Sequence, residues 1–468
     1  MSENSIAKIA VSAATYSLDK PYDYLIPDSM RGAVQPGMRV TVPFSRGNRR
    51  SEGIVLALGD KSEFEKLKAI ESLLDESPVL TQAQLKLALW MHDRLFCTVY
   101  DAIKSILPAG FWFKPDGERR VNDKMRDMAY LMIDAEEAFS IAQGKRRKAP
   151  MQASLLELIS TTGRVSVHEA LHFTGASRQS LTALVNAGIV EIEKEEVFRR
   201  PKVWNGKLRE LPVLNRAQSA AYEGLRELLI HPTPEAALLC GVTGSGKTSV
   251  YIHLISDTLR SGKSAILLVP EIALTPQMIR TFSEYFGNDV AILHSNLSLG
   301  ERYDEWKRIK NGDAQLVIGT RSAVFAPFED LGLIIIDEEQ EESYKSENSP
   351  RYHARDIAKY RCAKTNSLLL LGSATPDVES RYAAQTGKYV YFELPERYNE
   401  MHLPEVTIVD MKCELKAGNG SELSSTLRRE LEENIERGEQ SILFINRRGA
   451  HKLLSCGACG YTYKCPRC

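Results

Sequence analysis

The sequence predicts a multidomain α/β protein in which a β-rich N-terminal domain and a winged helix precede a parallel sheet that binds nucleotide. Two motifs and one periodic pattern carry this prediction. Gly241–Thr248 fits the phosphate-loop pattern G-x-x-x-x-G-K-[ST], and Asp337 ends the apolar, strand-like run Leu333–Ile336. From about residue 205 onward, strand-like and helix-like segments alternate as they do in a doubly wound parallel sheet.

Length and composition limit the possible classes of protein. At 468 residues the chain is too long for one core. Its 43% hydrophobic and 26% charged residues are ordinary for a globular protein. The net charge of −1 leaves any nucleic-acid binding to local basic patches. Neither a signal peptide nor an apolar run of about 18 residues is visible, so we expect a cytoplasmic chain with no membrane partner.

The N-terminal part is expected to hold two small domains. Residues 1–110 start with short strand-like runs separated by Pro and Gly, and a helix is expected near 82–100. Residues 111–204 are expected to hold a linker or exposed helix over 115–150, then a winged helix over 151–200 with three short helices and a β-wing. Winged helices bind DNA in many proteins and act as scaffolds in others, and the sequence leaves both roles open.

The C-terminal part is expected to hold two α/β units. Residues 205–402 would form the nucleotide-binding lobe, and residues 403–455 would start a second lobe. Within this second lobe we expect a charged helix at 427–437 and then a strand at 441–446. Residues 456–468 form a separate, cysteine-rich segment.

The phosphate loop is expected to bind ATP through backbone N–H groups at a helix N-terminus. Lys247 would reach the β- and γ-phosphates, and the Thr248 hydroxyl would bind Mg²⁺. The Gln218 amide is expected to read the adenine edge; the alternative is a helix capped by Asn215 with Gln218 exposed. The expected ATP-binding residues of the loop are Gly241, Val242, Thr243, Gly244, Ser245, Gly246, Lys247 and Thr248.

Two further strands end in polar side chains. Asp337 is expected to hold Mg²⁺, because an acid at the end of an apolar strand is typical of the metal-binding position. Gly372–Pro376 follows a leucine-rich strand. Its Ser373 and Thr375 are expected to relay, through hydrogen bonds, between the nucleotide site and a bound nucleic-acid strand.

Two loops carry candidate DNA contacts. Thr320 and Arg321 follow a strand and are expected to donate to DNA phosphates; the alternative is that they only cap a loop. Between residues 343 and 356, aromatic residues are interleaved with cations, which suits base stacking and phosphate contact. The alternative is an exposed polar loop with its tyrosines packed underneath. The expected contacts in this loop are Tyr344, Lys345, Arg351, Tyr352, His353 and Arg355.

Two C-x-x-C knuckles at the end of the chain predict zinc binding. In a cytosolic chain such crowding favours Zn²⁺ over disulfides, because each knuckle presents two thiolates to one ion. The gap between the knuckles is short for one closed site, so each knuckle is expected to need a partner pair that this sequence does not contain. The predicted ligands are Cys456, Cys459, Cys465 and Cys468.

Together these motifs resemble the bacterial replication-restart helicase family PriA, or primosomal protein N′. The family pattern of aromatic-Asp-Tyr followed by Gly-x-Arg-Val-x-Val-Pro-Phe is similar to Tyr22–Tyr24 and Gly37–Phe44. The resemblance implies a superfamily 2, 3′→5′ DNA helicase with a 3′-end-binding domain, a winged helix and two RecA-like lobes, the second with a zinc insertion. It implies DNA contacts by Tyr22, Asp23, Tyr24 and Arg39.

The resemblance also implies roles at the nucleotide site. Lys247, Asp337 and Glu338 would be catalytic, with Glu338 orienting or deprotonating the attacking water. Gln340 stands where the family usually has His, and its amide is expected to serve the same coupling role. The chain stops at Cys468, before the second half of the zinc region and the later motif with a catalytic Arg, so we expect a C-terminally truncated helicase.

The implied function is to recognise abandoned replication forks and to start primosome assembly. The implied cofactors are ATP, Mg²⁺ and Zn²⁺. The implied partners are forked DNA with a 3′ end, single-stranded DNA, single-stranded-DNA-binding protein and other primosome proteins, in the bacterial cytoplasm at the nucleoid. Two alternatives stay open: a fork-binding protein without turnover, and a different translocase such as an RNA helicase or a restriction-type motor.

Overall fold

The computed structural model describes residues 5–112, 121, 123–199, 206, 208–231, 233–397 and 405–444, with the backbone of short strands at 454–455 and 462–463. The chain divides into two compact units, Met1–Met401 and His402–Cys468, which are described separately. None of the helices in these ranges is long and apolar enough to cross a membrane.

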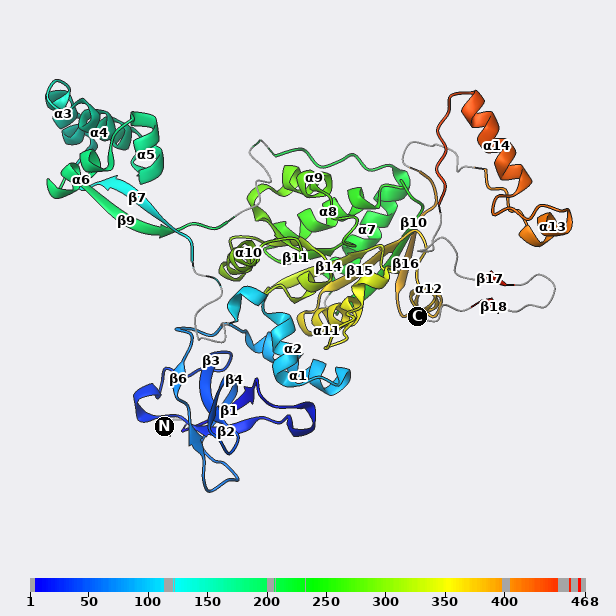
Figure 1. Cartoon of the computed structure of the whole chain (residues 1–468), viewed down its shortest axis with the longest axis horizontal. Coiled ribbons are helices and arrows are strands. Elements are labelled where there is room, and N and C mark those ends of the chain that lie inside the picture. Colours follow the sequence, from blue (N-terminus) through cyan, green and yellow to red (C-terminus); the bar gives the residue numbers. More distant parts are fainter. Residues whose placement is uncertain are drawn as a thin grey trace. The chain divides into compact units, whose positions relative to one another are not determined.

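The N-terminal domain is a 6-stranded sheet with the order β5-β2-β1-β4-β3-β6 (Figure 1). The pairs β1–β2, β1–β4 and β3–β4 are antiparallel. The sheet buries Ile9, Val40 and Val55 completely, so the predicted β-rich domain is confirmed. The strands are β1 (Ile6–Val11), β2 (Tyr22–Leu25), β3 (Arg39–Phe44), β4 (Arg49–Gly59), β5 (Lys68–Ala69) and β6 (Ser72–Leu73).

Two helices join this domain to the large sheet. They are α1 (Gln82–Leu95) and α2 (Val99–Ile106). Thr81 and Thr98 cap them, each accepting a hydrogen bond from a backbone N–H of the first turn. Their apolar faces enter the same hydrophobic core as one face of the large sheet, and that core includes Trp306. The predicted helix at 82–100 is therefore two helices with a break after Leu95.

The winged-helix domain begins earlier than the sequence suggested. Its antiparallel sheet has the order β8-β7-β9, and β7 pairs with β9 from Met125 to Leu131. The described part of the segment expected to be a linker or an exposed helix is therefore a strand and a largely exposed helix, so the linker alternative is wrong for β7 and the exposed-helix alternative matches α3. Only Ala129 of β7 is buried, so the strand lacks an alternating apolar pattern. The elements are β7 (Met125–Leu131), α3 (Ala135–Lys145), α4 (Pro150–Thr162), β8 (Arg164–Ser166), α5 (Val167–Thr174), α6 (Arg178–Asn186) and β9 (Val190–Glu196).

The large sheet has 7 strands in the order β12-β13-β11-β14-β15-β10-β16. Every neighbouring pair in it is parallel, as predicted. The strands are β10 (Glu235–Gly241), β11 (Ser264–Leu268), β12 (Val290–Leu293), β13 (Leu316–Gly319), β14 (Leu331–Asp337), β15 (Leu368–Ser373) and β16 (Val390–Leu394). The helices are α7 (Arg216–Ile230), α8 (Lys247–Arg260), α9 (Pro276–Phe286), α10 (Leu299–Asn311), α11 (Ala354–Thr365) and α12 (Val378–Gln385).

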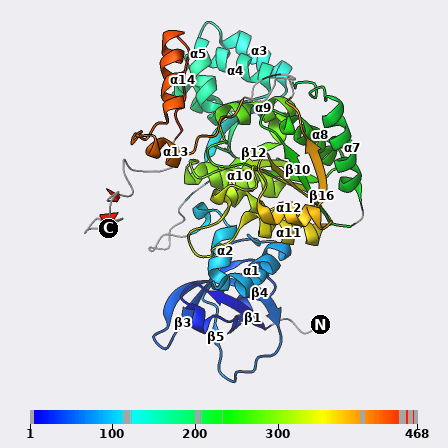
Figure 2. The same ribbon diagram turned by 90° about the vertical axis from the view of Figure 1, so that its right-hand side faces the viewer.

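Both faces of this sheet are covered, which explains its continuous apolar strands. Side chains that alternate along β14 enter two separate cores: Ile334 and Ile336 share one with residues of α1, α2 and α11, and Leu333 and Ile335 share the other with residues of α7, α8 and α9. Figure 2 shows these two sets of helices on opposite sides of the sheet. Because the strands are parallel, their carboxyl ends meet at one edge, where ligands bind in such sheets.

The second unit contains α13 (Met411–Lys416), α14 (Ser425–Glu436) and the antiparallel pair β17 (Leu454–Ser455) and β18 (Thr462–Tyr463). The predicted charged helix corresponds to α14. The predicted strand at 441–446 is wrong for its described part, because residues 441–444 belong to no strand. Ile442 and Phe444 are exposed there, so this apolar run lacks the neighbouring strand that a buried position requires.

Candidate nucleotide site and DNA contacts

Three neighbouring strands bring the predicted nucleotide motifs to one edge. In the order β14-β15-β10, Asp337 lies beside Gly372, and Ser373 lies beside Cys240. The adjoining cavity measures about 450 Å³. Its lining residues are Thr243, Gly244, Ser245, Gly246, Lys247, Thr248, Ser249, Asp337 and Glu338.

The phosphate loop has the backbone needed to surround an anion. Gly244 and Gly246 both have φ of +80°, a left-handed conformation that favours glycine. Gly246 is the N-cap of α8 and brings no side chain to satisfy the first N–H groups. The Ser245 hydroxyl is buried without a hydrogen-bond partner among the described residues. Unsatisfied donors at a helix N-terminus suit a phosphate group.

Lys247 is held by the protein's own atoms. Its Nζ donates to the Gly241 carbonyl at 2.9 Å and lies 3.7 Å from Glu338 Oε1. The ammonium group thus stands between the loop and the acidic strand end, close to where a terminal phosphate would sit.

Gln218 supports the phosphate loop from below. Its Nε2 donates to the Ser245 carbonyl at 2.8 Å, and its Oε1 accepts from the Asn215 backbone N–H at 3.0 Å. Asn215 caps α7, as the alternative interpretation expected, but Gln218 is fully buried and not exposed. Adenine recognition by Gln218 stays a prediction, and it requires this amide to change partners.

Asp337 is a half-buried carboxylate in a negative environment. Burial raises its pKa to about 6, and the neighbouring Glu338 carboxylate also raises it, whereas a hydrogen bond from Tyr251 opposes the shift. A bound cation would relieve this excess negative charge, and carboxylate and hydroxyl oxygens are ligands that Mg²⁺ accepts. Asp337, with Thr248 across the cavity, therefore fits a magnesium ion.

A chain of hydrogen bonds connects Glu338 to the Ser-Ala-Thr segment. Gln340 Nε2 donates to Glu338 Oε2 at 3.0 Å, and Ser373 Oγ donates to Gln340 Oε1 at 2.6 Å. The Thr375 backbone N–H then donates to Ser373 Oγ at 2.9 Å. A glutamine can complete this chain because its amide both donates and accepts. The three predicted coupling residues are therefore joined in the structure.

A buried ion pair beside this chain was not anticipated from the sequence. Glu339 is 1% exposed, and its carboxylate accepts from Arg355 at 2.7 Å, from Ser380 Oγ at 2.9 Å and from the Asp377 backbone N–H at 2.8 Å. Arg355, a predicted DNA contact, is thus a structural partner of the acidic motif. The signal for it was the second glutamate of the motif, which needs a cation when buried.

The loop after β14 places its aromatic residues in the core. Tyr344 is 1% exposed and donates to the Asp337 carbonyl at 2.7 Å. Tyr352 is 6% exposed and packs edge-on against Phe325. The alternative with tyrosines packed underneath is the one observed, which removes both residues from an open stacking surface. Lys345 and Arg351 are exposed.

His353 and the segment at Thr320 also serve the protein itself. His353 Nδ1 accepts from the Arg355 backbone N–H at 3.1 Å and caps α11. Thr320 is buried, and the Arg321 guanidinium donates to the Ser343 carbonyl at 3.2 Å. These contacts match the loop-capping alternative for Thr320 and Arg321.

The predicted 3′-end residues divide into two groups. Tyr22 and Asp23 are half-buried on β2, and Ser62 Oγ donates to Asp23 Oδ2 at 2.6 Å. Tyr24 is buried, and its hydroxyl donates to the Pro43 carbonyl at 3.2 Å. Tyr22 and Asp23 are therefore the members of this group that remain available to a DNA end.

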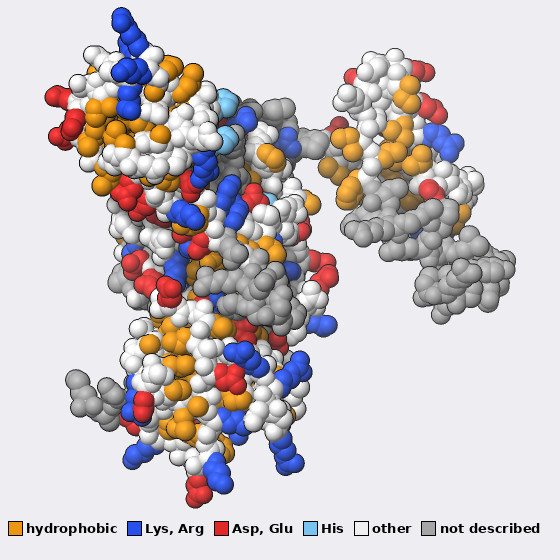
Figure 3. All heavy atoms as spheres, turned by 60° about the vertical axis from the view of Figure 1, so that its left-hand side comes forward, with side chains coloured by type: hydrophobic (Ala, Val, Ile, Leu, Met, Phe, Trp, Pro, Cys, Tyr) orange, Lys and Arg blue, Asp and Glu red, His pale blue; other side chains and the backbone are white. Residues whose placement is uncertain are grey.

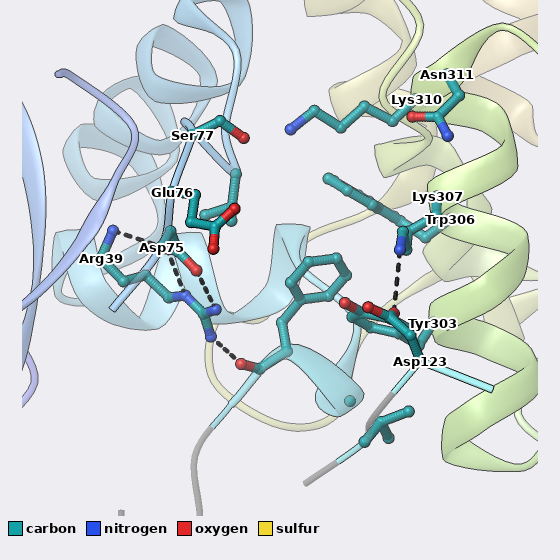
Figure 4. Close-up of a pocket in the computed structure, with 14 residues that line it drawn as sticks. Arg39, Asp75, Glu76, Ser77, Asp123, Tyr303, Trp306, Lys307, Lys310 and Asn311 are labelled. Atoms are coloured by element: carbon teal, nitrogen blue, oxygen red, sulfur yellow. Dashed lines mark hydrogen bonds and ion pairs between the residues drawn. The ribbon is translucent and has the colours of Figure 1, made fainter. Parts of the chain in front are cut away.

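Arg39 is also buried and links two parts of the chain. Its Nε donates to Asp75 Oδ2 at 2.9 Å, and its guanidinium also donates to the Phe111 carbonyl (Figure 4). Arg39 and Tyr24 are largely buried, and their side chains are bound to other parts of the protein, so direct DNA contact by these two residues stays a prediction.

The predicted zinc ligands Cys456, Cys459, Cys465 and Cys468 lie outside the described residues. Within the part of the chain that the structure describes, no three His, Cys, Asp or Glu side chains group as a metal site. On the face shown in Figure 3, basic and acidic side chains are interspersed, in keeping with the net charge of −1.

The parallel sheet, phosphate loop and acidic strand end define the class of P-loop helicase lobes. Comparison with known families agrees: residues 215–382 match the DEAD/DEAH box helicase family, and residues 8–108 match the 3′DNA-binding domain of PriA.

The curated relatives narrow this class. Replication restart protein PriA of Bacillus subtilis is 38% identical over 99% of this chain and 65% of its own length. Those of Chlamydia trachomatis and Haemophilus influenzae are each 35% identical, over 99% and 98% of this chain and 61% of their own lengths. The chain belongs to the PriA family, and it spans less than two thirds of the length of each of these relatives.

Proposed function

We propose that this chain binds ATP at the carboxyl edge of its parallel sheet and acts as an ATP-dependent 3′→5′ DNA helicase in replication restart. The observation that carries the proposal is that the phosphate loop, Asp337 and Glu338 line one cavity. Because the chain spans only part of its relatives' length, its activity, substrates and partners all belong to the proposal.

The residues of the cavity have different roles in ATP hydrolysis. The loop N–H groups and Lys247 bind the phosphates, and Lys247 exchanges the Gly241 carbonyl for a phosphate oxygen. Thr248 and Asp337 would hold Mg²⁺, which neutralises charge on the phosphate oxygens when bound. Glu338 orients or deprotonates the attacking water. Lys247 and Glu338 lie close enough that phosphate binding and water activation occur side by side.

We propose fewer residues as DNA contacts than the sequence predicted. Tyr22 and Asp23 are the candidates for the DNA 3′ end, and the exposed Lys345 and Arg351 are candidates for phosphate contact. The hydrogen-bond chain from Gln340 through Ser373 to Thr375 would report DNA occupancy to Glu338.

The proposed substrate is a forked DNA with a 3′ end and single-stranded DNA. The proposed partners are single-stranded-DNA-binding protein and other primosome proteins, in the bacterial cytoplasm. Zinc binding by the four knuckle cysteines is a further part of the proposal, supported by the C-x-x-C spacing. Measuring protein-bound zinc in the purified chain, and again after Cys456 and Cys459 are replaced by Ser, tests it.

The decisive experiment is ATP hydrolysis with and without a forked DNA. DNA-stimulated turnover is expected in the unchanged chain and should fall about 100-fold or more in Lys247→Ala, because a positioned charge on the transferring phosphate is lost. Lys263→Ala, an exposed lysine before β11 at the opposite edge of the sheet, is the matched control and should keep full activity.

Two outcomes would contradict the proposal. Fork binding without any turnover in the unchanged chain would leave a fork-binding protein. Equal binding of forks ending in a 3′-hydroxyl and a 3′-phosphate would count against recognition of the 3′ end.

A further inference from the structure

We propose that Tyr251 is a positioning residue that fixes the carboxylate of Asp337 for Mg²⁺ binding. The inference rests on the proposed nucleotide site and adds to it a residue that lies outside the phosphate-loop, acidic and Ser-Ala-Thr motifs. Tyr251 lies on α8, about one turn after Thr248, so the helix that begins at the phosphate loop also carries this tyrosine.

The contact is direct and partly buried. The Tyr251 hydroxyl donates to Asp337 Oδ1 at 2.9 Å. The Tyr251 side chain is 1% exposed and belongs to the core between the sheet and α7, α8 and α9. A ring fixed in this way gives the hydroxyl one position, so it sets the plane of the carboxylate that lines the cavity.

The neighbouring strand is shaped around this hydroxyl. A Cβ atom added to Gly372 would collide with the Tyr251 hydroxyl and lie 3.0 Å from its ring carbon Cζ. Glycine at the end of β15 therefore leaves the space in which Tyr251 and Asp337 meet. Three elements, α8, β14 and β15, combine to place one hydrogen bond.

The main chain of Asp337 is held as well. Tyr344 donates to its carbonyl from the loop that follows β14. Glu338, the next residue, has φ of +45°, a left-handed conformation that turns the chain sharply after Asp337. With its backbone held by Tyr344 and its side chain by Tyr251, Asp337 keeps one orientation relative to the phosphate loop.

Outer hydrogen bonds of this kind orient metal ligands, and their loss typically lowers metal affinity about 10- to 100-fold. The alternative is a merely structural role, in which the hydrogen bond only satisfies a buried tyrosine hydroxyl. The Mg²⁺ dependence of nucleotide binding distinguishes the two roles, because a loss of stability alone would not change it.

The test is the binding of a fluorescent ADP analogue during a Mg²⁺ titration and in EDTA. Tyr251→Phe should raise the Mg²⁺ concentration for half-maximal binding about 10-fold and leave the affinity in EDTA unchanged. Tyr222→Phe is the matched control: the Tyr222 hydroxyl, from α7, donates at 2.6 Å to Asp257 on α8, a carboxylate that, unlike Asp337, does not line the cavity. It should leave the titration unchanged.

Tyr251→Phe with an unchanged Mg²⁺ titration would overturn the inference. If the unchanged chain binds no nucleotide with or without Mg²⁺, the proposed nucleotide site itself fails, so the two failures are distinguishable.

A second variant reaches the same hydrogen bond from β15. Gly372→Ala should displace the tyrosine hydroxyl and shift the Mg²⁺ titration in the same direction. In the Tyr251→Phe background its effect should be clearly smaller, because the hydroxyl it displaces is gone. Effects that multiply fully in the double variant would show that Gly372 and Tyr251 act independently and would contradict the proposed geometry.

Discussion

The edge of the sheet at the phosphate loop and the loop of residues 341–356 differ in where their polar groups point. At the edge, Lys247, Asp337 and Glu338 line an open cavity. In the loop, Tyr344 and Arg355 turn inward and bind the backbone and side chain of the acidic motif. The first region is arranged to receive a ligand, and the second is arranged to hold the first in place. A loop fixed so firmly to the end of β14 can transmit a contact made at its exposed residues.

The largest expected effect is a loss of stability on replacing Arg39, which, like Tyr344 and Arg355, is a predicted DNA contact whose side chain is bound inside the protein. Arg39→Ala leaves Asp75 buried without its partner and should destabilise the N-terminal sheet by about 3–5 kcal/mol. Hydrogen exchange of the β1, β3 and β4 amides measures this. Arg31→Ala, which removes an exposed ion pair with Asp28, should cost about 1 kcal/mol or less.

The same variant distinguishes a structural role from a DNA contact. Normal amide protection together with a loss of 3′-end binding in Arg39→Ala would restore Arg39 as a DNA contact. Reduced protection in the N-terminal sheet would place its role in the fold.

Ser373 tests whether the edge is joined to the DNA side by hydrogen bonds. Ser373→Ala leaves Gln340 Oε1 without its donor and should lower the stimulation of hydrolysis by DNA about 10-fold, with basal hydrolysis nearly unchanged. Steady-state hydrolysis with and without forked DNA measures both. Ser367→Ala is the matched control, since this serine is also buried and lies just before the other end of β15. Equal losses of stimulation in both variants would argue against a specific relay.

These differences show which parts of the molecule the sequence could predict. The strands around the phosphate loop follow from continuous apolar runs, and the loop follows from glycines at fixed spacing. Burial of Arg39 depends on Asp75, 36 residues away, and the Tyr251 contact joins residues 86 apart. Such pairs leave no local pattern. Aromatic residues interleaved with cations also favoured Tyr344 and Tyr352 as stacking residues, but an aromatic side chain suits a core as well as a nucleic-acid surface, so the pattern could not decide between the two.

Lys345 and Arg351 are the exposed cations of the loop, so they test whether the loop contacts DNA and not whether it holds the acidic motif. Replacing both with Ala should weaken single-stranded DNA binding and reduce the slope of log affinity against log salt by about 1.4, the value for two phosphate contacts. DNA titrations at several salt concentrations measure the slope. The exposed Lys263, before β11, is the control position. An unchanged slope would mean that this loop does not touch the phosphate backbone.

The smallest expected effect is the pH dependence of the hydrogen bond by which His353, at the end of the loop, caps α11. Burial lowers the pKa of His353 below its usual 6.5, and the nearby Arg355 lowers it further, so the folded state favours neutral imidazole. Its Nδ1 must be unprotonated to accept the Arg355 backbone N–H. Below pH 6.5 the unfolded segment binds a proton that the folded one does not, so stability is complete above that pH and is lost as pH falls.

A helix cap of this kind contributes about 1 kcal/mol. Hydrogen exchange in the first turn of α11 should therefore accelerate between pH 7 and pH 5.5, after correction for the intrinsic exchange rate. His353→Asn keeps a capping acceptor that does not titrate, so its protection should be independent of pH over this range. If the unchanged chain and His353→Asn show the same pH dependence, the cap is not the titrating group, and the loop is held by its other contacts, such as the Arg355–Glu339 pair and the Tyr344 hydrogen bond.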